Sequence, residues 1–318
     1  MVSTSKTRQA CTPSISPMTL LLSLLFLAAH SNPCHAFASV TTTTSGSRVS
    51  SSTPLFATTA TPSEAVDMAN VGFVLLAGGK GSRMKANMPK QFLELRGKPV
   101  LQHSLDLFLD QLPKFLTAND KTAPAAVILV MDPMYQPDYQ YLLDKYPAGQ
   151  LAFANPGVER QGSVENGLTE LAKLAKGNVE YAAIHDSARP LVTIDEICHV
   201  VRDAKQVGAA VLGVPCKATI KESEDGETVL RTIPRARLWE VHTPQVVKME
   251  TLQRGFEKVA KENLEVTDDV SIVEALGEPV KLTLGEYTNL KITTPEDMDV
   301  ASAILEERQQ QEKKLAAA

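Results

Sequence analysis

A glycine-rich loop directly after an apolar run is the feature that most constrains the fold of this chain. The sequence reads Val74-Leu75-Leu76-Ala77-Gly78-Gly79-Lys80-Gly81-Ser82-Arg83-Met84 and continues a few residues later with Pro89-Lys90. The apolar run is typical of a buried strand, and the glycines let a ligand approach bare backbone N–H groups. Because two cations, Arg83 and Lys90, follow in the same stretch, we predict a binding site for a polyphosphate.

Three kinds of ligand-binding glycine loop compete for this stretch. A P-loop requires G-x-x-x-x-G-K-[ST], but here Gly-Lys comes too early and no Ser or Thr follows the lysine in register. A dinucleotide fingerprint, G-x-G-x-x-G, can start at Gly79, but its third glycine falls on Met84. The nucleotidyltransferase pattern A-G-G-x-G-x-R-M, followed by P-K, fits at every fixed position. A plain turn without a ligand needs one glycine rather than three.

Residues 1–66 are predicted to be a disordered targeting presequence. The first acidic residue of the chain is Glu64, and an apolar run over 19–29 is too short to span a bilayer but typical of a signal peptide. Ala36-Phe37 is a plausible cleavage point, and the Ser- and Thr-rich segment after it is typical of a transit peptide. This signal-plus-transit arrangement resembles the presequences of proteins sent to secondary plastids, so we expect the plastid stroma. A secreted protein with a linker is the alternative.

Cysteine content and charge narrow the compartment and the partners. Only Cys198 and Cys216 lie outside the presequence, and two cysteines without a C-x-x-C motif fit a reducing compartment. The six histidines do not cluster, so no zinc site is predicted. From Glu64 onward, 37 acidic residues outnumber 29 basic ones, which argues against a nucleic-acid partner. We also expect no membrane partner for the mature form.

Apolar runs and helical repeats alternate through the rest of the chain. Strands are predicted at 73–77, 126–131, 151–154, 181–184, 209–214 and 280–284, and helices at 99–112, 163–174, 194–205, 249–259, 268–275 and 295–306. This alternation predicts an α/β fold with a Rossmann-like, mostly parallel sheet of the nucleotidyltransferase type. The domain is expected to span 67–308, followed by a polar, frayed tail over 309–318.

The segment 216–240 interrupts the alternation. Two β-like runs, 217–222 and 228–233, flank a stretch that contains Asp225-Gly226, and Asp-Gly between such runs predicts a β-hairpin. A lone two-stranded hairpin is marginal in water and requires a surface to pack on. A second subunit would supply that surface, so we predict a protruding dimerisation arm and a homodimer. Folding back onto its own domain is the alternative.

Polar residues after the predicted strands are the candidate site residues, because ligands of an open parallel sheet bind at the carboxyl ends of its strands. Gly157 and Ser163 follow the third strand and can offer backbone groups and a hydroxyl to a base, although Ser163 could be a plain helix cap. Asp186 and Arg189 follow the fourth strand and could hold a sugar phosphate or form a structural pair. Lys291 follows the last strand between apolar residues, so its alternation points it away from the core.

These pieces together resemble one family, 2-C-methyl-D-erythritol 4-phosphate cytidylyltransferase of the non-mevalonate isoprenoid pathway. The resemblance covers about residues 71–306, and separate motifs occur in the family's order. Besides the glycine loop they are Pro89-Lys90-Gln91, Arg160-x-x-Ser163-Val164, His185-Asp186-Ser187-Ala188-Arg189-Pro190, Thr219-Ile220-Lys221, Leu238-Trp239, Thr243-Pro244-Gln245, Val266-Thr267-Asp268 and Asn289-Leu290-Lys291-Ile292-Thr293.

The resemblance implies transfer of CMP from CTP to 2-C-methyl-D-erythritol 4-phosphate, with release of pyrophosphate. It implies that Arg83 and Lys90 stabilise the transition state, and that Arg235 and Lys291 aim the attacking phosphate. The residues implied to hold the nucleotide are Ala77, Gly78, Gly79, Gly81, Arg83, Lys90, Gly157 and Ser163. The residues implied to hold the acceptor are Asp186, Arg189, Thr219, Arg235, Thr267 and Lys291, of which Thr219 and Arg235 would reach the partner subunit's site.

Attack of one phosphate on another requires positioning and charge neutralisation rather than a side-chain nucleophile. Mg²⁺ or another divalent cation is the expected cofactor, held mainly by the CTP phosphates. The chain departs from the family pattern at Pro156-Gly157-Val158, where two glycines are common, and at His242, where glutamine is common. A ribitol- or other pentitol-phosphate cytidylyltransferase and a catalytically inactive nucleotide sensor are the alternatives; the presequence disfavours the first, and the retained cations disfavour the second.

Overall fold

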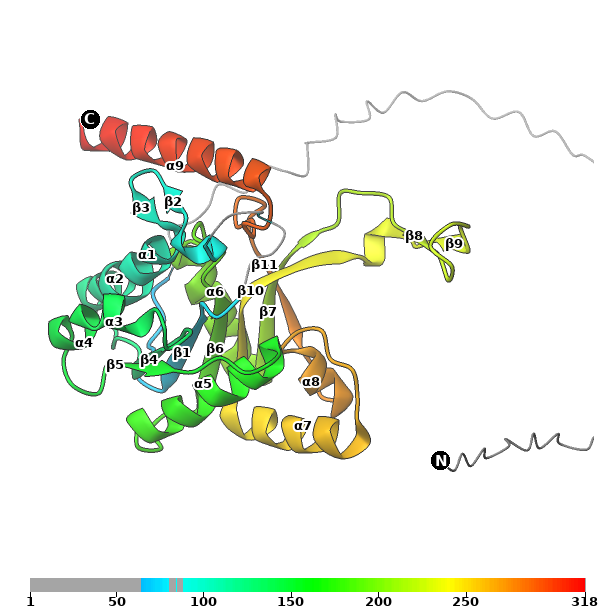
Figure 1. Cartoon of the computed structure of the whole chain (residues 1–318), viewed down its shortest axis with the longest axis horizontal. Helices are drawn as coiled ribbons and strands as arrows, with labels where there is room; N and C mark the ends of the chain where they lie inside the picture. Colours follow the sequence, from blue (N-terminus) through cyan, green and yellow to red (C-terminus); the bar gives the residue numbers. More distant parts are fainter. Residues whose placement is uncertain (1–63, 80–83, 85–87, 318) are drawn as a thin grey trace, which may run out of the picture. The chain divides into compact units, whose positions relative to one another are not determined.

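The computed structural model describes residues 64–79, 84 and 88–317, and these form a seven-stranded sheet covered by helices (Figure 1). The strand order is β11-β7-β10-β6-β1-β4-β5. Neighbouring strands are parallel except for β10, which runs antiparallel to both β6 and β7. The bounds are β1 (Val71–Leu76), β4 (Ala126–Val130), β5 (Leu151–Ala154), β6 (Tyr181–Asp186), β7 (Ala209–Pro215), β10 (Trp239–Lys248) and β11 (Lys281–Leu284). The predicted α/β class with a mostly parallel sheet is confirmed.

Both faces of the sheet are buried, which explains why its strands appear in the sequence as continuous apolar runs. Along β1, Phe73 and Leu75 join one apolar cluster and Val74 joins the other. The first cluster includes residues of α6 and of a continuous helical segment made of α1, a π-helical turn and α2. The second cluster includes residues of α5, α7 and α8. The bounds are α1 (Val100–Leu105), a π-helical turn (Asp106–Gln111), α2 (Leu112–Ala118), α5 (Arg160–Leu174), α6 (Ile194–Val207), α7 (Met249–Glu262) and α8 (Ser271–Ala275).

The helix α9 (Pro295–Ala316) is longer than its sequence pattern predicts. A capping box between Thr294 and Asp297 starts the helix, with a proline in its first turn. Beyond Glu306 the sequence consists largely of helix-forming residues and contains neither Gly nor Pro. Arg308 also ties the helix to the domain by donating to the Leu191 carbonyl at 2.8 Å. The prediction of a frayed tail from residue 309 is therefore wrong.

The strand β10 is absent from the sequence-based predictions. Pro244 cannot donate a ladder hydrogen bond, and a proline in a central strand argues against that assignment. The Thr243-Pro244 bond is cis, and the register of β10 against β7 shifts between Val241 and Gln245. Polar residues of this irregular stretch, such as Gln245, are buried and bonded rather than exposed. Tertiary contacts thus override the local sequence signal.

The predicted hairpin is present, but its two strands are shorter than predicted. Its paired residues are β8 (Lys221–Glu222) and β9 (Arg231–Thr232), and Figure 1 shows them away from the seven-stranded sheet. The Asp225 carboxylate accepts the N–H groups of Glu227 and Thr228, and Gly226 takes a positive φ of 76°. This arm exposes apolar side chains that its own domain does not cover, namely Ile220, Val229 and Leu230.

The remaining described elements are short connections. They are η2 (Lys90–Phe92), β2 (Glu94–Leu95), β3 (Lys98–Pro99), α3 (Gln136–Tyr139), α4 (Tyr141–Lys145) and η4 (Arg235–Arg237). Most of the predicted presequence lies outside the described residues, but Ala65 and Val66 pack against the core. Among the described helices, none is both long and apolar enough to cross a membrane.

We expect Leu171→Ala to be strongly destabilising. Leu171 is fully buried on α5 and packs directly onto β1, since a Cβ added to Gly72 would lie 2.5 Å from its Cδ1 atom. Removing a buried leucine side chain leaves a cavity and typically costs about 2–5 kcal/mol. Chemical denaturation should show this loss, whereas Leu315→Ala, at a side chain 78% exposed, should change the unfolding free energy little. Equal effects of the two variants would contradict the packing described here.

Candidate active site

A cavity of about 660 Å³ opens where the strand order reverses. Strand β1 has β4 and then β5 on one side and β6 on the other, so the chain changes direction across the sheet at this point. Crevices at such switch points, outside the carboxyl ends of the strands, are the usual ligand sites of open α/β sheets. The cavity is lined by residues that follow β1, β4, β5, β6 and β11.

The described part of the glycine loop forms one wall of this cavity. The Ala77 N–H donates to the Val130 carbonyl at 2.8 Å, and the Gln91 Nε2 donates to the Ala77 carbonyl at 2.6 Å. Gly78 packs tightly, because a Cβ there would lie 2.7 Å from the Cβ of Pro156. A Cβ on Gly79 would instead meet open space. Gly81 and Arg83, two of the predicted nucleotide-binding residues, lie outside the described residues.

The loop after β5 forms the adjoining part of the cavity wall. The Gly157 N–H donates to the Ser163 Oγ at 2.9 Å, and that hydroxyl donates to the Glu159 carbonyl at 3.1 Å. Glu159, rather than Ser163, occupies the N-cap position of α5. Ser163 therefore lies within the first turns of α5, where it closes the loop and faces the cavity. A helix cap, the alternative considered from the sequence, is not its role.

Lys90 and Lys291 converge on the cavity although they are far apart in the sequence. The Lys90 Nζ donates to the Ile292 carbonyl at 2.7 Å, so it holds the segment that contains Lys291. The Lys291 Nζ forms an ion pair with the Asp186 carboxylate at the end of β6. A small apolar cluster that includes Val100, Ile292 and Ala301 packs this segment against α1 and α9. The structure thus brings both predicted lysines to one site.

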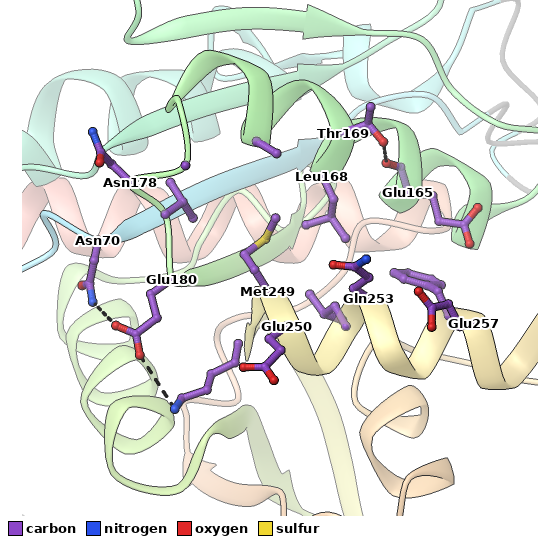
Figure 2. A pocket seen from close by; sticks show the side chains of 16 residues that line it. Asn70, Glu165, Leu168, Thr169, Asn178, Glu180, Met249, Glu250, Gln253 and Glu257 are labelled. Carbon is purple, nitrogen blue, oxygen red and sulfur yellow. Dashed lines mark hydrogen bonds and ion pairs between the residues drawn. The ribbon is translucent and has the colours of Figure 1, made fainter.

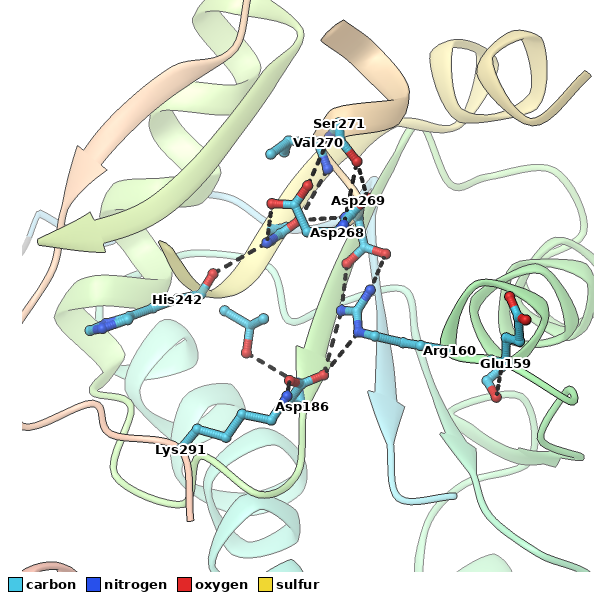
Figure 3. A network of polar contacts seen from close by, with 12 residues as sticks. Glu159, Arg160, Asp186, His242, Asp268, Asp269, Val270, Ser271 and Lys291 are labelled. Carbon is cyan, nitrogen blue, oxygen red and sulfur yellow. Dashed lines mark hydrogen bonds and ion pairs between the residues drawn. The ribbon is translucent and has the colours of Figure 1, made fainter. Parts of the chain in front are cut away.

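Asp186 is held between two cations (Figure 3). Its Oδ1 atom lies 3.4 Å from Arg160, and its Oδ2 atom pairs with Lys291. Burial would raise the pKa of Asp186, but the charges of Arg160 and Lys291 outweigh this effect and hold the pKa well below its usual range. Its N–H donates to the Thr243 hydroxyl at 3.1 Å. The carboxylate is therefore ionised and fixed at the cavity wall.

Arg160 and Asp269 are site residues that were not singled out from the sequence. Arg160 begins α5 and donates to both carboxylate oxygens of Asp269, at 2.7 and 2.8 Å. Arg160 occurs in a quoted motif, and Asp269 directly follows another, Val266-Thr267-Asp268. Their place in or next to a motif was the only indication in the sequence. It does not predict that these two side chains form a pair.

Arg189, predicted to bind the acceptor, does not line the cavity. Its guanidinium donates to the carbonyls of Asn289 at 2.7 Å and Val241 at 3.2 Å, so it braces the segments that flank the site. The buried His185 bonds to the Arg189 carbonyl and to Thr243, and burial lowers the pKa of His185 to about 4. The geometry favours a structural role for Arg189, and its contact with substrate stays a prediction.

The other predicted acceptor-binding residues lie outside the cavity of their own chain. Thr267 lines a small hollow of about 30 Å³ beside Arg160. Thr219 and Arg235 belong to the arm and are exposed, and the Arg235 Nη1 donates to the Lys217 carbonyl at 3.1 Å. Their predicted placement in a partner subunit's site stays a prediction.

A second, larger cavity of about 930 Å³ lies between α5 and α7 (Figure 2). It lies at the amino ends of the strands, opposite the switch-point cavity, because Asn70 and Glu180 in its wall directly precede β1 and β6. Its charged lining is mostly acidic, with Glu165, Glu180, Glu250 and Glu257 against Lys248. An anionic polyphosphate would be repelled there, so the smaller cavity is the candidate active site.

A glycine loop at a switch point, with lysines and a fixed carboxylate around one cavity, defines an α/β nucleotidyltransferase. The comparisons with known proteins specify the family. Residues 71–307 match the family model IspD, 2-C-methyl-D-erythritol 4-phosphate cytidylyltransferase. The chain belongs to this family and is an enzyme of the cytidylyltransferase class.

Individual relatives agree with this assignment. The chloroplastic 2-C-methyl-D-erythritol 4-phosphate cytidylyltransferase of Oryza sativa subsp. japonica is 46% identical over 245 residues, which cover 77% of each chain. The enzyme of that name from Desulforamulus reducens is 41% identical over 76% of this chain and 98% of its own. A crystal structure of that enzyme from Thermus thermophilus matches with a TM-score of 0.56 at 29% identity, covering 75% of this chain and 98% of its own.

Gly157→Ala is expected to damage the nucleotide site. Its Cβ would lie 2.5 Å from the backbone carbon of Gly162, so the loop after β5 must move. A displacement of about 1 Å in a binding wall can cost roughly 10²-fold, so we expect CTP affinity, measured by calorimetry, to fall at least tenfold. Gly162→Ala is the matched control, because its Cβ makes only an ordinary contact of 3.4 Å with Gly157. Equal CTP affinity in the two variants would count against this site.

Proposed function

We propose that the chain transfers CMP from CTP to 2-C-methyl-D-erythritol 4-phosphate, forming 4-diphosphocytidyl-2-C-methyl-D-erythritol and pyrophosphate. Family membership and relatives named for this substrate support the reaction. The structural observation with most weight is the convergence of Lys90 and Lys291 on a glycine-walled cavity at the switch point. The acceptor phosphate attacks the α-phosphorus of CTP, and pyrophosphate leaves.

Repulsion between the two substrates is the main obstacle to this reaction, because an anion attacks an anion. Cations placed before the reaction lower this barrier without any side-chain nucleophile. Lys90 has its ammonium fixed by a backbone carbonyl, and Lys291 has its ammonium fixed by Asp186. We assign transition-state stabilisation to Lys90 together with Arg83, and orientation of the attacking phosphate to Lys291 together with Arg235.

The cavity walls suggest how each substrate binds. The backbone from Ala77 to Gly81 would surround the phosphates and ribose, while Gly157 and Ser163 would read the cytosine. Asp186 and Lys291, on the opposite side of the glycine loop from β5, would hold the methylerythritol phosphate. Thr267 would contribute only after a local movement, because it does not line the cavity.

Mg²⁺ is proposed as the cofactor, brought in mainly by the CTP phosphates. Among the described residues, no group of three or more His, Cys, Asp or Glu side chains is placed to hold a metal ion. This donor set fits a metal that is ligated mostly by substrate oxygens and water, as Mg²⁺ commonly is. When bound, the ion would supply additional neutralisation of the phosphate charge.

A homodimer and a plastid location complete the proposal. The arm exposes apolar side chains, and its Thr219 and Arg235 lie outside their own cavity. A partner subunit would cover these apolar side chains, and its active-site cavity would receive Thr219 and Arg235. A chloroplastic relative and a signal-plus-transit sequence pattern support the plastid stroma.

Pyrophosphate release with CTP should be fast with 2-C-methyl-D-erythritol 4-phosphate and much slower with ribitol 5-phosphate. The reason is that the site must position one acceptor phosphate in line with the α-phosphorus, and a differently shaped acceptor misplaces it. The assay uses the chain from Glu64 onward with Mg²⁺, and EDTA should abolish turnover in the same reaction. Faster turnover of ribitol 5-phosphate would establish the pentitol enzyme instead, and no turnover of either would favour a nucleotide sensor.

Mixing two inactive variants, Lys90→Ala and Arg235→Ala, should restore activity. Each alone loses one placed cation, which typically costs about 10²–10³-fold in rate. In a mixed dimer, one site receives an intact Lys90 from its own chain and an intact Arg235 from the partner's arm. Random exchange should therefore recover about a quarter of wild-type activity. No recovery, with dimer exchange verified by light scattering of tagged subunits, would mean that Arg235 acts within its own chain.

A further inference from the structure

Asp269 is a buried carboxylate just before α8 that does not line the active-site cavity. It is only 2% exposed, yet both of its oxygens accept hydrogen bonds from Arg160, at 2.7 and 2.8 Å. Figure 3 shows this pair beside Asp186, with Arg160 between the two acids. A bidentate pair of this kind fixes the plane as well as the position of a guanidinium.

The same guanidinium makes only a long contact with Asp186. Its Nε and Nη2 atoms both lie 3.4 Å from the Asp186 Oδ1, well beyond the distances to Asp269. Asp186 instead pairs closely with Lys291 through its other oxygen. Arg160 therefore binds Asp269 closely through two hydrogen bonds and makes only a longer, weaker contact with Asp186.

We propose that Asp269 is a positioning residue, which keeps the Arg160 guanidinium from closing onto Asp186 and so leaves the Asp186–Lys291 pair available to the acceptor substrate. The inference rests on the proposed function, in which Lys291 orients the phosphate of the acceptor and Asp186 helps to hold the acceptor molecule. Asp269 acts on the reaction through Arg160 and makes no contact with substrate itself.

Charge and competition explain the effect. With Asp269 present, two carboxylates face two cations, and the group of four is neutral. Without the Asp269 charge, Asp186 becomes the partially buried partner that Arg160 must use, because an uncompensated buried charge is costly. A guanidinium binds a carboxylate in bidentate fashion better than an ammonium does. Arg160 would then displace Lys291 from the Asp186 Oδ2 atom with which it pairs.

The surroundings of Asp269 hold it rigidly enough for this task. The Gln245 Oε1 accepts the N–H groups of Asp269 at 2.8 Å and of Val270 at 3.1 Å. The Gln245 Nε2 donates to Asp268 at 3.1 Å, so one side chain of β10 anchors the whole turn before α8. Burial raises the pKa of Asp269, and the charge of Arg160 opposes that rise.

Asp269→Asn tests the inference, because it should change the KM for the acceptor but not the Kd for CTP. The mutation keeps the size of the side chain but removes its charge, so Arg160 is released. We expect the KM for 2-C-methyl-D-erythritol 4-phosphate to rise roughly tenfold to a hundredfold, as for a misplaced binding group. The Kd for CTP, measured by calorimetry, should change less than about twofold, because the glycine loop is untouched. An unchanged acceptor KM would overturn the proposal.

Arg160→Met separates positioning from a merely structural role. If Asp269 acts only through Arg160, adding Asp269→Asn to Arg160→Met should change the acceptor KM less than about twofold. The double variant also lacks the unpaired buried charge, so this comparison remains possible if Asp269→Asn alone fails to fold. A further tenfold loss in the double variant would overturn the proposal.

Glu278→Gln serves as the matched control, since it removes the carboxylate of another Arg–carboxylate pair, with Arg254, away from the cavity. Its acceptor KM should equal that of the unmutated chain. Failure of the proposed function is distinguishable, because the unmutated chain would then show no turnover of this acceptor. With an active unmutated chain, the variants alone decide the role of Asp269.

Discussion

The ion pair between Lys291 and Asp186 is the interaction on which the rest of the site depends. It joins the end of β6, in the centre of the sheet, to a segment more than a hundred residues later that has no place in the sheet. Neighbouring contacts strengthen this connection: Lys90 and Arg189 each donate to backbone carbonyls of the same segment. A partly buried ion pair is costly unless its geometry is supported, and these bonds supply the support.

The placement of individual charges around the cavity, rather than the overall charge, determines how an acidic protein can bind polyanionic substrates. From Glu64 onward the chain has a net charge of −8, and the charged residues that line the larger cavity between α5 and α7 are mostly glutamates. The described lining of the switch-point cavity instead balances three acidic residues with three basic ones, Lys90, Arg160 and Lys291. Because exposed charges are screened within about 8–10 Å at physiological ionic strength, the charges that line the cavity affect a bound phosphate more than distant surface charges do. Overall charge therefore says little about the chemistry of the site.

Sequence patterns predicted what depends on local chemistry. The continuous apolar strands and the glycine loop follow from residue type and spacing, and β1, β4, β6 and β7 lie within two residues of their predicted bounds. Lys291 was found because alternation along the chain points it out of the core. Gly157 was found because its loop follows a strand, and the structure adds the reason that only glycine fits there: its Cα packs against the backbone of Gly162.

The features that sequence patterns missed depend on contacts between distant segments. The central position of β10 requires its neighbours on both sides to accommodate a proline, and nothing local indicates that they do. The pairing of Arg160 with Asp269 joins residues 109 positions apart. Arg189 carries the same charge whether it faces a substrate or two backbone carbonyls, so residue type alone could not distinguish a binding group from a brace.

A crystal structure of the chain from Glu64 onward, with Mg²⁺ and a non-hydrolysable CTP analogue, tests the central claim most directly. We expect the triphosphate against the backbone of Ala77–Gly79, within reach of the Lys90 ammonium, and the base beside Gly157 and Ser163. A nucleotide bound between α5 and α7, or at any surface that Lys90 and Lys291 do not share, would contradict that claim.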